Sequence, residues 1–385
     1  MPTVVVAGAV ANKHRAGGSI WVRMSWAEAL RDAGFDVVFV EEIAPGSCVD
    51  AAGAPAPVET SANLAVFART MQDFGFAGSA ALVCPADGAV HGMDRAALFA
   101  RAQDAALLVN LGGHLRWPPL LRRLRRRAFV DLDPGYTQIW HAEGRDVGVA
   151  GHHGHFTVGL NVGRRGCPLP TSGVRWLPIR QPVALDRWPV AAGDAPPRFT
   201  TVASWRGAFG PPSWRGRTYG VKAHQFRRFA DVPRMVDAEF EVALDIHAAD
   251  AADARRLRNG GWSVVDPAAV ATTDGFRGYV QRSGAELSPA QGVYVETASG
   301  WFSDRTVRYL ACGRPALVQD TGLGDALPVG EGLLTFRDAQ EAAAGARAVV
   351  ADPARHAAAA RRIAEEHFAG PRAIAPLLEA LGVAP

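Results

Sequence analysis

Short apolar runs alternate with segments of helical spacing along this chain, and no other feature limits the possible folds as strongly. Residues 3–7 form an apolar run, residues 21–30 carry apolar side chains at helical intervals, and residues 35–40 are apolar again. A strand, a helix and a second strand in this order are typical of parallel strands joined by a crossover helix. The sequence therefore predicts an α/β protein built from Rossmann-like, doubly wound sheets.

The pattern occurs in two series that a proline-rich stretch separates. The first predicts further strands at residues 80–83, 106–110 and 128–131, and helices at 61–74, 94–103 and 117–126. The second predicts strands at residues 199–203, 240–246, 263–265, 316–319 and 333–336, and helices at 338–350, 353–367 and 373–381. Prolines at positions 178, 182, 189, 196 and 197 favour an extended connector. At 385 residues we expect two domains facing across a cleft, residues 1–185 and 198–368.

Charge and cysteine content narrow the class of partner. Lys and Arg total 41 against 38 Asp and Glu, so the balance does not indicate nucleic acid or a membrane. A basic run leaves membrane contact open, with a solvated helix face as the alternative: Arg122, Arg123, Arg125, Arg126 and Arg127. The first residues lack a basic, apolar leader, which predicts a cytoplasmic protein. The four cysteines form no Cys-x-x-Cys pair, so no disulfide framework or zinc site is indicated.

The segment from Ser299 to Pro315 is the most informative for chemistry. A Gly-aromatic-Ser turn precedes a helix that begins near Ser303, and a Gly-x-Pro leads into the apolar run 316–319. The first N–H groups of a helix have no partners inside it and carry the positive end of its dipole. They can hold a diphosphate, with Asp304, Arg305 and Thr306 beside them. An ordinary helix cap is the alternative explanation.

In this order of elements the chain resembles the GT-B superfamily of glycosyltransferases, particularly the group-1 type. The phrase Gly300 to Arg305, with the later Gly-Arg-Pro and Gln-Asp-Thr-Gly, is similar to a poorly characterised bacterial subgroup. The resemblance implies a hexosyltransferase-like enzyme that uses a nucleotide sugar and needs no metal or other cofactor. It also implies an acceptor on the first domain, the donor on the second, and a final helix, residues 370–385, that crosses back to the first domain.

The start of the second series fits the same resemblance. Arg206 follows the strand 199–203 and Lys222 begins the next helix, where cations of the superfamily bind the donor diphosphate. They would neutralise charge on the leaving group, with solvated surface cations as the alternative. Glu286 lies in a segment that resembles the loop before the phosphate-binding helix, and we expect it to help fix the donor.

The chain departs from the group-1 pattern at the ribose. The two glutamates spaced around the phosphate-binding turn are missing, and Arg308 stands near the place of the ribose-binding glutamate. Asp304 and Glu296 are the candidate substitutes.

The first series offers candidate catalytic residues. Gly17 and Gly18 precede a helix and would let the backbone approach a sugar or phosphate. His14 in the same loop is a candidate general base, and Asp133, at the end of a strand, is the competing one. An exposed loop histidine and a turn-forming Asp-Pro are the respective alternatives.

A cluster of histidines, His152-His153-Gly154-His155, suggests a metal site. No carboxylate or thiol accompanies it at a familiar spacing, so no metal is expected. We expect His153 instead to touch the sugar.

The function favoured is transfer of a sugar from a nucleoside diphosphate to a hydroxyl of a small molecule or glycan. The resemblance favours retention of the anomeric configuration, while the sugar, nucleobase, acceptor and oligomeric state stay open. One alternative is a nucleotide-sugar epimerase of the same fold. The other is an NAD(P)-dependent oxidoreductase, for which Glu41 and Glu42 suit a nicotinamide ribose, although no Gly-x-Gly-x-x-Gly occurs.

Overall fold

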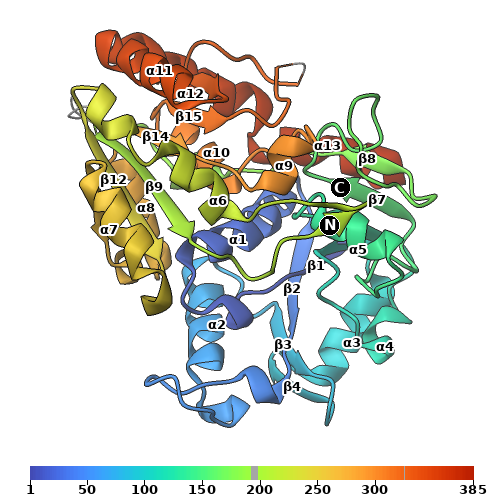
Figure 1. The fold of residues 1–385 in the computed structure, drawn as a ribbon. Coiled ribbons are helices and arrows are strands. Elements are labelled where there is room, and N and C mark those ends of the chain that lie inside the picture. Colours follow the sequence, from blue (N-terminus) through green and yellow to red (C-terminus); the bar gives the residue numbers. More distant parts are fainter. Residues whose placement is uncertain (192–197, 325) are drawn as a thin grey trace.

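The computed structural model describes residues 1–191, 198–324 and 326–385, and its first sheet has eight strands (Figure 1). In spatial order they are β4 (Ala89–Gly92), β3 (Ala80–Cys84), β2 (Asp36–Glu42), β1 (Thr3–Ala7), β5 (Leu107–Leu111), β6 (Arg127–Asp131), β7 (Gly154–Thr157) and β8 (Trp176–Pro178). Every pair is parallel except β3 and β4. The chain runs outward from β1 to one side and then to the other, so the order reverses between β1 and β5.

The second sheet repeats this plan with six parallel strands. They are β13 (Trp262–Val265), β12 (Glu239–Asp245), β9 (Arg198–Ser204), β14 (Ala285–Ser288), β15 (Ala316–Gln319) and β16 (Leu333–Phe336). Here the order reverses between β9 and β14. A small antiparallel ribbon, β10 (Ser213–Trp214) and β11 (Arg217–Thr218), follows β9. The predicted α/β class with two Rossmann-like sheets is confirmed.

Helices cover both sheets. Those of the first part are α1 (Gly17–Asp32), α2 (Ala62–Asp73), α3 (Arg95–Asp104), α4 (Pro118–Leu121) and α5 (Tyr136–Ala142). Those of the second are α6 (Lys222–Phe226), α7 (Ala251–Asn259), α8 (Thr273–Gln281), α9 (Gly292–Glu296), α10 (Asp304–Ala311), α11 (Ala339–Ala351), α12 (Pro353–His367) and α13 (Gly370–Leu381). No helix in the described residues is long and apolar enough to cross a membrane.

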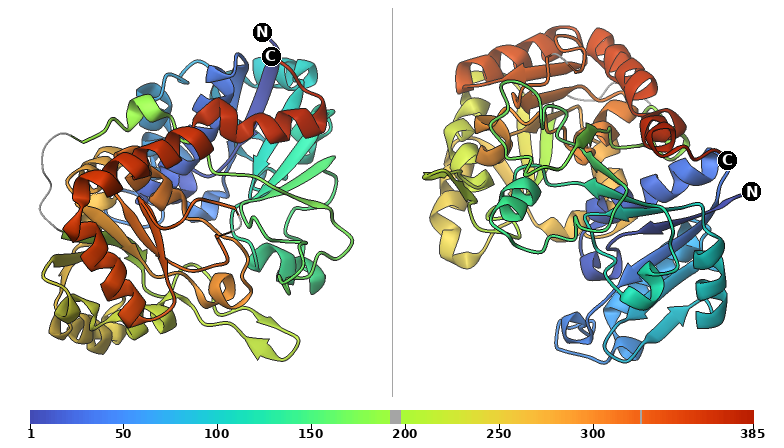
Figure 2. Two further views of the ribbon diagram at one scale, coloured as in Figure 1. Left: turned by 90° about the horizontal axis from the view of Figure 1, so that it is seen from above. Right: turned by 90° about the vertical axis from the view of Figure 1, so that its right-hand side faces the viewer.

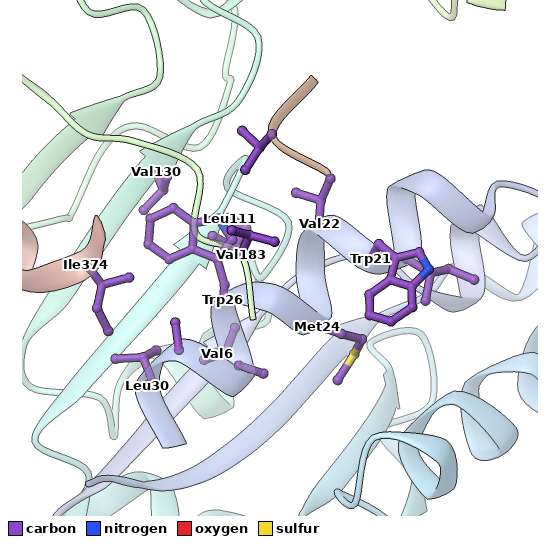
Figure 3. Packing of buried hydrophobic residues seen from close by; sticks show 14 of the residues in the cluster. Val6, Trp21, Val22, Met24, Trp26, Leu30, Leu111, Val130, Val183 and Ile374 are labelled. Carbon is purple, nitrogen blue, oxygen red and sulfur yellow. The ribbon is translucent and has the colours of Figure 1, made fainter. Parts of the chain in front are cut away.

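Helix α1 lies where the two parts of the molecule meet, and the C-terminal helix α13 packs against it (Figures 1 and 2). Ile374, Leu377 and Leu378 of α13 are buried in a cluster that also contains Trp26 and Leu30 of α1 (Figure 3). The same cluster includes side chains from both sheets, so the apolar core continues from one part into the other. The domain limits at 1–185, 198–368 and 370–385 stay a prediction.

Several expected elements differ in detail. The helix expected at 117–126 ends at Leu121, and the basic run that follows forms a partly exposed turn before β6. The segment around Glu286, expected to be a loop, is instead the end of α8 and the central strand β14. That strand has only four residues and carries a glutamate, so it shows no apolar run. The end of the expected connector, with Pro196 and Pro197, lies outside the described residues.

Candidate functional site

Two adjoining pockets lie between the sheets, next to the carboxyl ends of the strands. The large pocket has a volume of about 680 Å³ and is lined by Lys13, Arg23, His114 and Asp133, among others. The small pocket has a volume of about 360 Å³ and is lined by residues of both parts. The two share four wall residues: Ser19, Gly207, Gln291 and Asp304. Doubly wound sheets bind ligands at this edge, close to the point where the strand order reverses.

Three cations line the small pocket: Arg15, Lys222 and Arg305. Arg305 of α10 is buried, and its Nε donates to Glu286 Oε1 at 2.6 Å while Nη1 donates to the Val202 carbonyl at 2.7 Å. Lys222, the first residue of α6, has no hydrogen-bonded partner in the described part of the chain. Its enclosure by protein, together with the charge of Arg305, lowers the pKa of Lys222 to about 7. An anion in the pocket would stabilise the protonated amine.

The amino end of α1 forms another wall of the small pocket. A Cβ atom on Gly17 would lie 2.1 Å from the Thr272 carbonyl oxygen, and one on Gly18 would lie 2.9 Å from the Phe276 ring. The helix therefore packs directly on α8 and the residues before it. No side chain caps its free N–H groups at Ala16, and these groups carry the positive end of the helix dipole.

The amino end of α10 places its predicted residues differently. Asp304 lines both pockets, next to Arg305. Ser303 and Thr306 instead line a closed space of about 10 Å³ with Ser288. Of the predicted diphosphate ligands, the structure thus brings Gly17, Gly18, Lys222, Asp304 and Arg305 to one pocket.

Arg206 and Glu286 are not at the positions expected of ligands. Arg206 is exposed and forms a two-point ion pair with Asp250, at 2.7 and 2.9 Å, in a separate groove. The preceding residue, Trp205, points into the core, and the Arg206 side chain points away from it toward solvent. Glu286 is fully buried in β14 and contacts Arg305 rather than either pocket. Glu286 therefore holds the Arg305 side chain in place.

Asp133 lies in the large pocket at the end of β6. The buried Asp131 holds the backbone there, accepting hydrogen bonds from Thr137, Gln138, Thr157 and the Asp133 N–H. Asp133 is exposed to the large pocket, and the Tyr294 hydroxyl of the second part donates to its Oδ1 at 3.4 Å. Its enclosure and the neighbouring Asp131 raise the pKa of Asp133 to about 6. The carboxyl group is therefore mostly ionised at neutral pH, and its pKa lies close enough to neutral pH for it to accept a proton.

Five cationic or imidazole side chains of the large pocket were not predicted: Lys13, Arg23, His114, Arg116 and Arg145. Arg23 of α1 has no carboxylate within 4 Å among the described residues, and its stem fits because Gly8 has no side chain. Lys13 lies near it, and both its burial and the Arg23 charge lower the pKa of Lys13. The sequence did contain one indication of a functional role for Arg23, because this arginine lies among the apolar residues of the segment 21–30.

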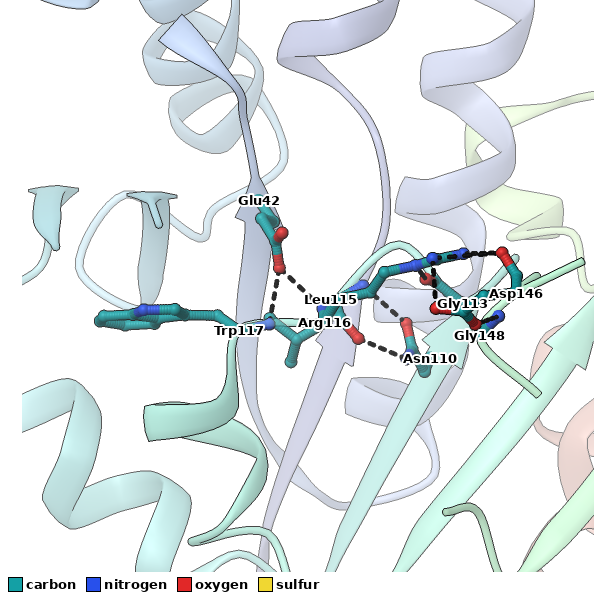
Figure 4. Close-up of polar contacts among 8 residues, drawn as sticks. All are labelled: Glu42, Asn110, Gly113, Leu115, Arg116, Trp117, Asp146 and Gly148. Atoms are coloured by element: carbon teal, nitrogen blue, oxygen red, sulfur yellow. Dashed lines mark hydrogen bonds and ion pairs between the residues drawn. The ribbon is translucent and has the colours of Figure 1, made fainter. Parts of the chain in front are cut away.

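The third, His114, lies in a loop that is held at several points (Figure 4). Asn110 exchanges two 3.0 Å hydrogen bonds with the Leu115 backbone. Glu42 accepts from the Arg116 and Trp117 N–H groups at 2.7 and 2.8 Å. Enclosure and the charge of Arg23 lower the pKa of His114 to about 3, so it is neutral.

Glu41 and Glu42 do not face either pocket. Glu41 accepts three backbone N–H groups, from Val10, Ala11 and Asn12, at 2.6 to 2.8 Å. Both carboxylates therefore hold loops, and their interpretation as ribose ligands of a nicotinamide cofactor is wrong.

The predicted histidines lie away from the cleft. His14 Nδ1 is 3.3 Å from the Asn63 amide nitrogen, and His14 lines neither pocket. His153 is exposed at the amino end of β7, opposite the edge that carries the pockets, and accepts from the Arg127 N–H. His152 and His155 pack around Phe129. Within the described ranges, no group of three or more His, Cys, Asp or Glu side chains is placed to hold a metal ion.

The residues considered for the ribose are also engaged elsewhere. Arg308 is fully buried and donates to Ser25 Oγ of α1 at 3.1 Å and to the Asp304 carbonyl. Glu296 forms an ion pair with Arg217 at 2.5 Å. Neither side chain lines the large or the small pocket.

Comparison with known proteins gives one family and several related folds. Residues 244–375 match the family model described as glycosyl transferase-like. No curated protein sequence matches the chain. Anabaena Alr3699/HepE in complex with UDP-glucose superposes with a TM-score of 0.57 at 11% identity, over 99% of this chain and 100% of that one. The pneumococcal O-GlcNAc transferase GtfA with UDP and GlcNAc gives 0.56 at 8% identity, over 99% and 98%. A glycosyltransferase from Rickettsia africae gives 0.53 at 8% identity, over 99% and 97%.

Proposed function

We propose that this protein, a glycosyltransferase of the GT-B fold with a group-1-like C-terminal domain, transfers a sugar from a UDP-sugar to an acceptor hydroxyl. The observation that carries the proposal is the pair of adjoining pockets, one lined by Lys222 and Arg305 and the other by Asp133. UDP is the proposed nucleotide because structures of the same fold are described with UDP, UDP-glucose, or UDP and GlcNAc.

The small pocket suits the donor diphosphate. Lys222, Arg305 and the free N–H groups at the start of α1 all present positive charge to it. As the glycosidic bond breaks, negative charge grows on the diphosphate, and fixed cations stabilise that charge more than they stabilise the intact donor. In this proposal Glu286 keeps Arg305 in place, and Arg206 takes no direct part.

The large pocket suits the transferred sugar and the acceptor. Asp133 is the proposed group that takes the proton of the acceptor hydroxyl, since a carboxylate with a pKa of about 6 is basic enough at neutral pH. Arg23 and Lys13 beside it favour its ionised form. A general base of this kind is expected for a single displacement with inversion, which differs from the retention that the resemblance favours. The predicted retention stays a prediction, which proton NMR of the product anomer tests.

The first test is calorimetric titration of the full chain with UDP, followed by assays of UDP release from a panel of UDP-sugars. We expect UDP to bind and at least one UDP-sugar to be turned over with a hydroxyl acceptor. Product analysis separates the alternatives: an epimerase returns an isomeric nucleotide sugar, and an oxidoreductase changes nicotinamide absorbance. If neither UDP nor any other nucleoside diphosphate binds, the proposal is refuted.

A further inference from the structure

The ribose of the donor presents two adjacent hydroxyl groups, which a carboxylate can accept together. Of the positions considered for this task, two are engaged elsewhere and the third, Asp304, lies at a different place in the cleft. Arg308 has no acceptor atom and is turned toward Ser25, and Glu296 is paired with Arg217. Asp304 lines the wall shared with the large pocket, at the end where the transferred sugar must lie.

Another carboxylate lines the small pocket. Asp245 is the last residue of β12, where it pairs in register with Ser204 of β9. The Ser204 hydroxyl donates to Asp245 Oδ2 at 3.1 Å. Oδ1 has no hydrogen-bonded partner, and no cation lies within 4 Å of the carboxylate, among the residues that the structure describes. Ser204 therefore fixes the orientation of the carboxylate through Oδ2, and Oδ1 is available to accept a hydrogen bond from a ligand.

The position of Asp245 in the sheet also favours a nucleoside. By chain order β12 is the second strand of its sheet, after β9. In doubly wound nucleotide-binding domains, an acidic residue beyond the second strand binds the ribose hydroxyls. Asp245 lines the small pocket and not the large one, so it marks the end remote from the transferred sugar.

Apolar residues adjoin this end of the pocket. Pro267 and Val270, which follow β13, and Phe276 of α8 line it together with Asp245. A flat base needs such an apolar surface, whereas a diphosphate needs cations, and Lys222 and Arg305 line the same pocket. The wall of the pocket thus offers apolar, acidic and cationic groups that suit the base, ribose and diphosphate of one ligand.

We propose that Asp245 binds the ribose hydroxyls of the donor nucleotide and replaces the glutamate that is missing from the phosphate-binding helix. This inference rests on the proposed function, because it takes a nucleoside diphosphate as the ligand. It assigns a new residue to recognition of ribose over deoxyribose.

The test compares the full chain with two variants, Asp245→Ala and Asp245→Asn. Asp274→Ala is the matched control, because it removes an exposed carboxylate from the same part of the molecule without touching the pocket. Calorimetry measures the dissociation constants of UDP, 2′-deoxy-UDP and 3′-deoxy-UDP for each protein. Melting temperatures establish that all four proteins are folded.

We expect the unmodified protein and the control to prefer UDP over at least one deoxy analogue by about tenfold or more, as is usual for a hydrogen bond to a charged group. In Asp245→Ala this preference should fall to nearly one, with the deoxy analogue bound as before. UDP binding with an undiminished preference in Asp245→Ala would overturn the inference and leave the proposed function intact. So would equal binding of all three ligands by the unmodified protein. Absence of UDP binding would refute both.

Discussion

The charge state of Lys222 gives the sharpest test of the donor site. In the free protein its pKa is about 7, and the charged groups around it are Arg305, Glu286 and Asp304. A diphosphate beside the amine favours the protonated form and raises this pKa. Binding above neutral pH must therefore take up a proton, and affinity must fall as pH rises.

The magnitude follows from the free pKa. At about pH 8 only about a tenth of the free protein carries a protonated Lys222, so UDP binding should take up about 0.9 proton. At about pH 6 the uptake by this group should be only about 0.1 proton. If the bound form stays protonated, the dissociation constant should rise about 50-fold between about pH 7 and pH 9.

Calorimetry in buffers of different ionisation enthalpy measures this uptake directly. Lys222→Met should bind UDP more weakly and lose the proton uptake at about pH 8. Asp133→Asn is the control, since a carboxyl with a pKa of about 6 contributes little at that pH. If the unmodified protein binds UDP at about pH 8 without proton uptake, or if Lys222→Met retains the uptake, the assigned role of Lys222 is refuted.

Three further outcomes are expected. Asp133→Asn should slow transfer by about 10²- to 10⁴-fold with little change in the UDP dissociation constant, and an unchanged rate would remove Asp133 as the base. Gly17→Ala should lower stability by about 1–3 kcal/mol and weaken UDP binding, because its methyl group would strike the second part of the molecule; thermal melting and calorimetry would show neither loss if the contact were unimportant. Deletion of residues 370–385 should expose the apolar face of α1 and lower the melting temperature or the solubility, whereas an unchanged melt would contradict the packing of α13.

The predictable parts of the molecule were those that depend on local pattern. Apolar runs such as residues 3–7 and 316–319 are strands with the expected limits, because burial on both faces of a parallel sheet selects continuous apolar runs. The strand β14 was missed because its Glu286 is acceptable there only through the ion pair with Arg305, nineteen residues later. No short window of sequence contains both partners.

In the site, too, residues within a local motif could be predicted, whereas residues whose role depends on distant partners could not. The chain segments around Lys222 and Arg305 were predicted through a motif, and both residues line the small pocket. Arg206 looked equivalent to Lys222 in sequence, but Asp250, 44 residues later, binds it outside the cleft. Arg23 and His114 come from segments without a recognisable motif, and only the sheet topology brings them into one pocket.

The contacts along α1 restrict how the cleft can open. Gly17 lies against Thr272, the Trp21 Nε1–H donates to the Thr273 carbonyl at 2.9 Å, and Ser25 accepts from Arg308. A motion of the two parts that preserves these contacts must be a rotation about α1. Away from α1, Phe209 of the second part, which is 48% exposed, touches Trp140 of the first part, with ring centroids 4.8 Å apart. Phe209 also touches Tyr136, with ring centroids 5.7 Å apart, and the Asn161 amide donates to the Ala298 and Gly322 carbonyls at 3.0 and 2.8 Å. A rotation about α1 that separates the two parts would therefore have to break these contacts as well.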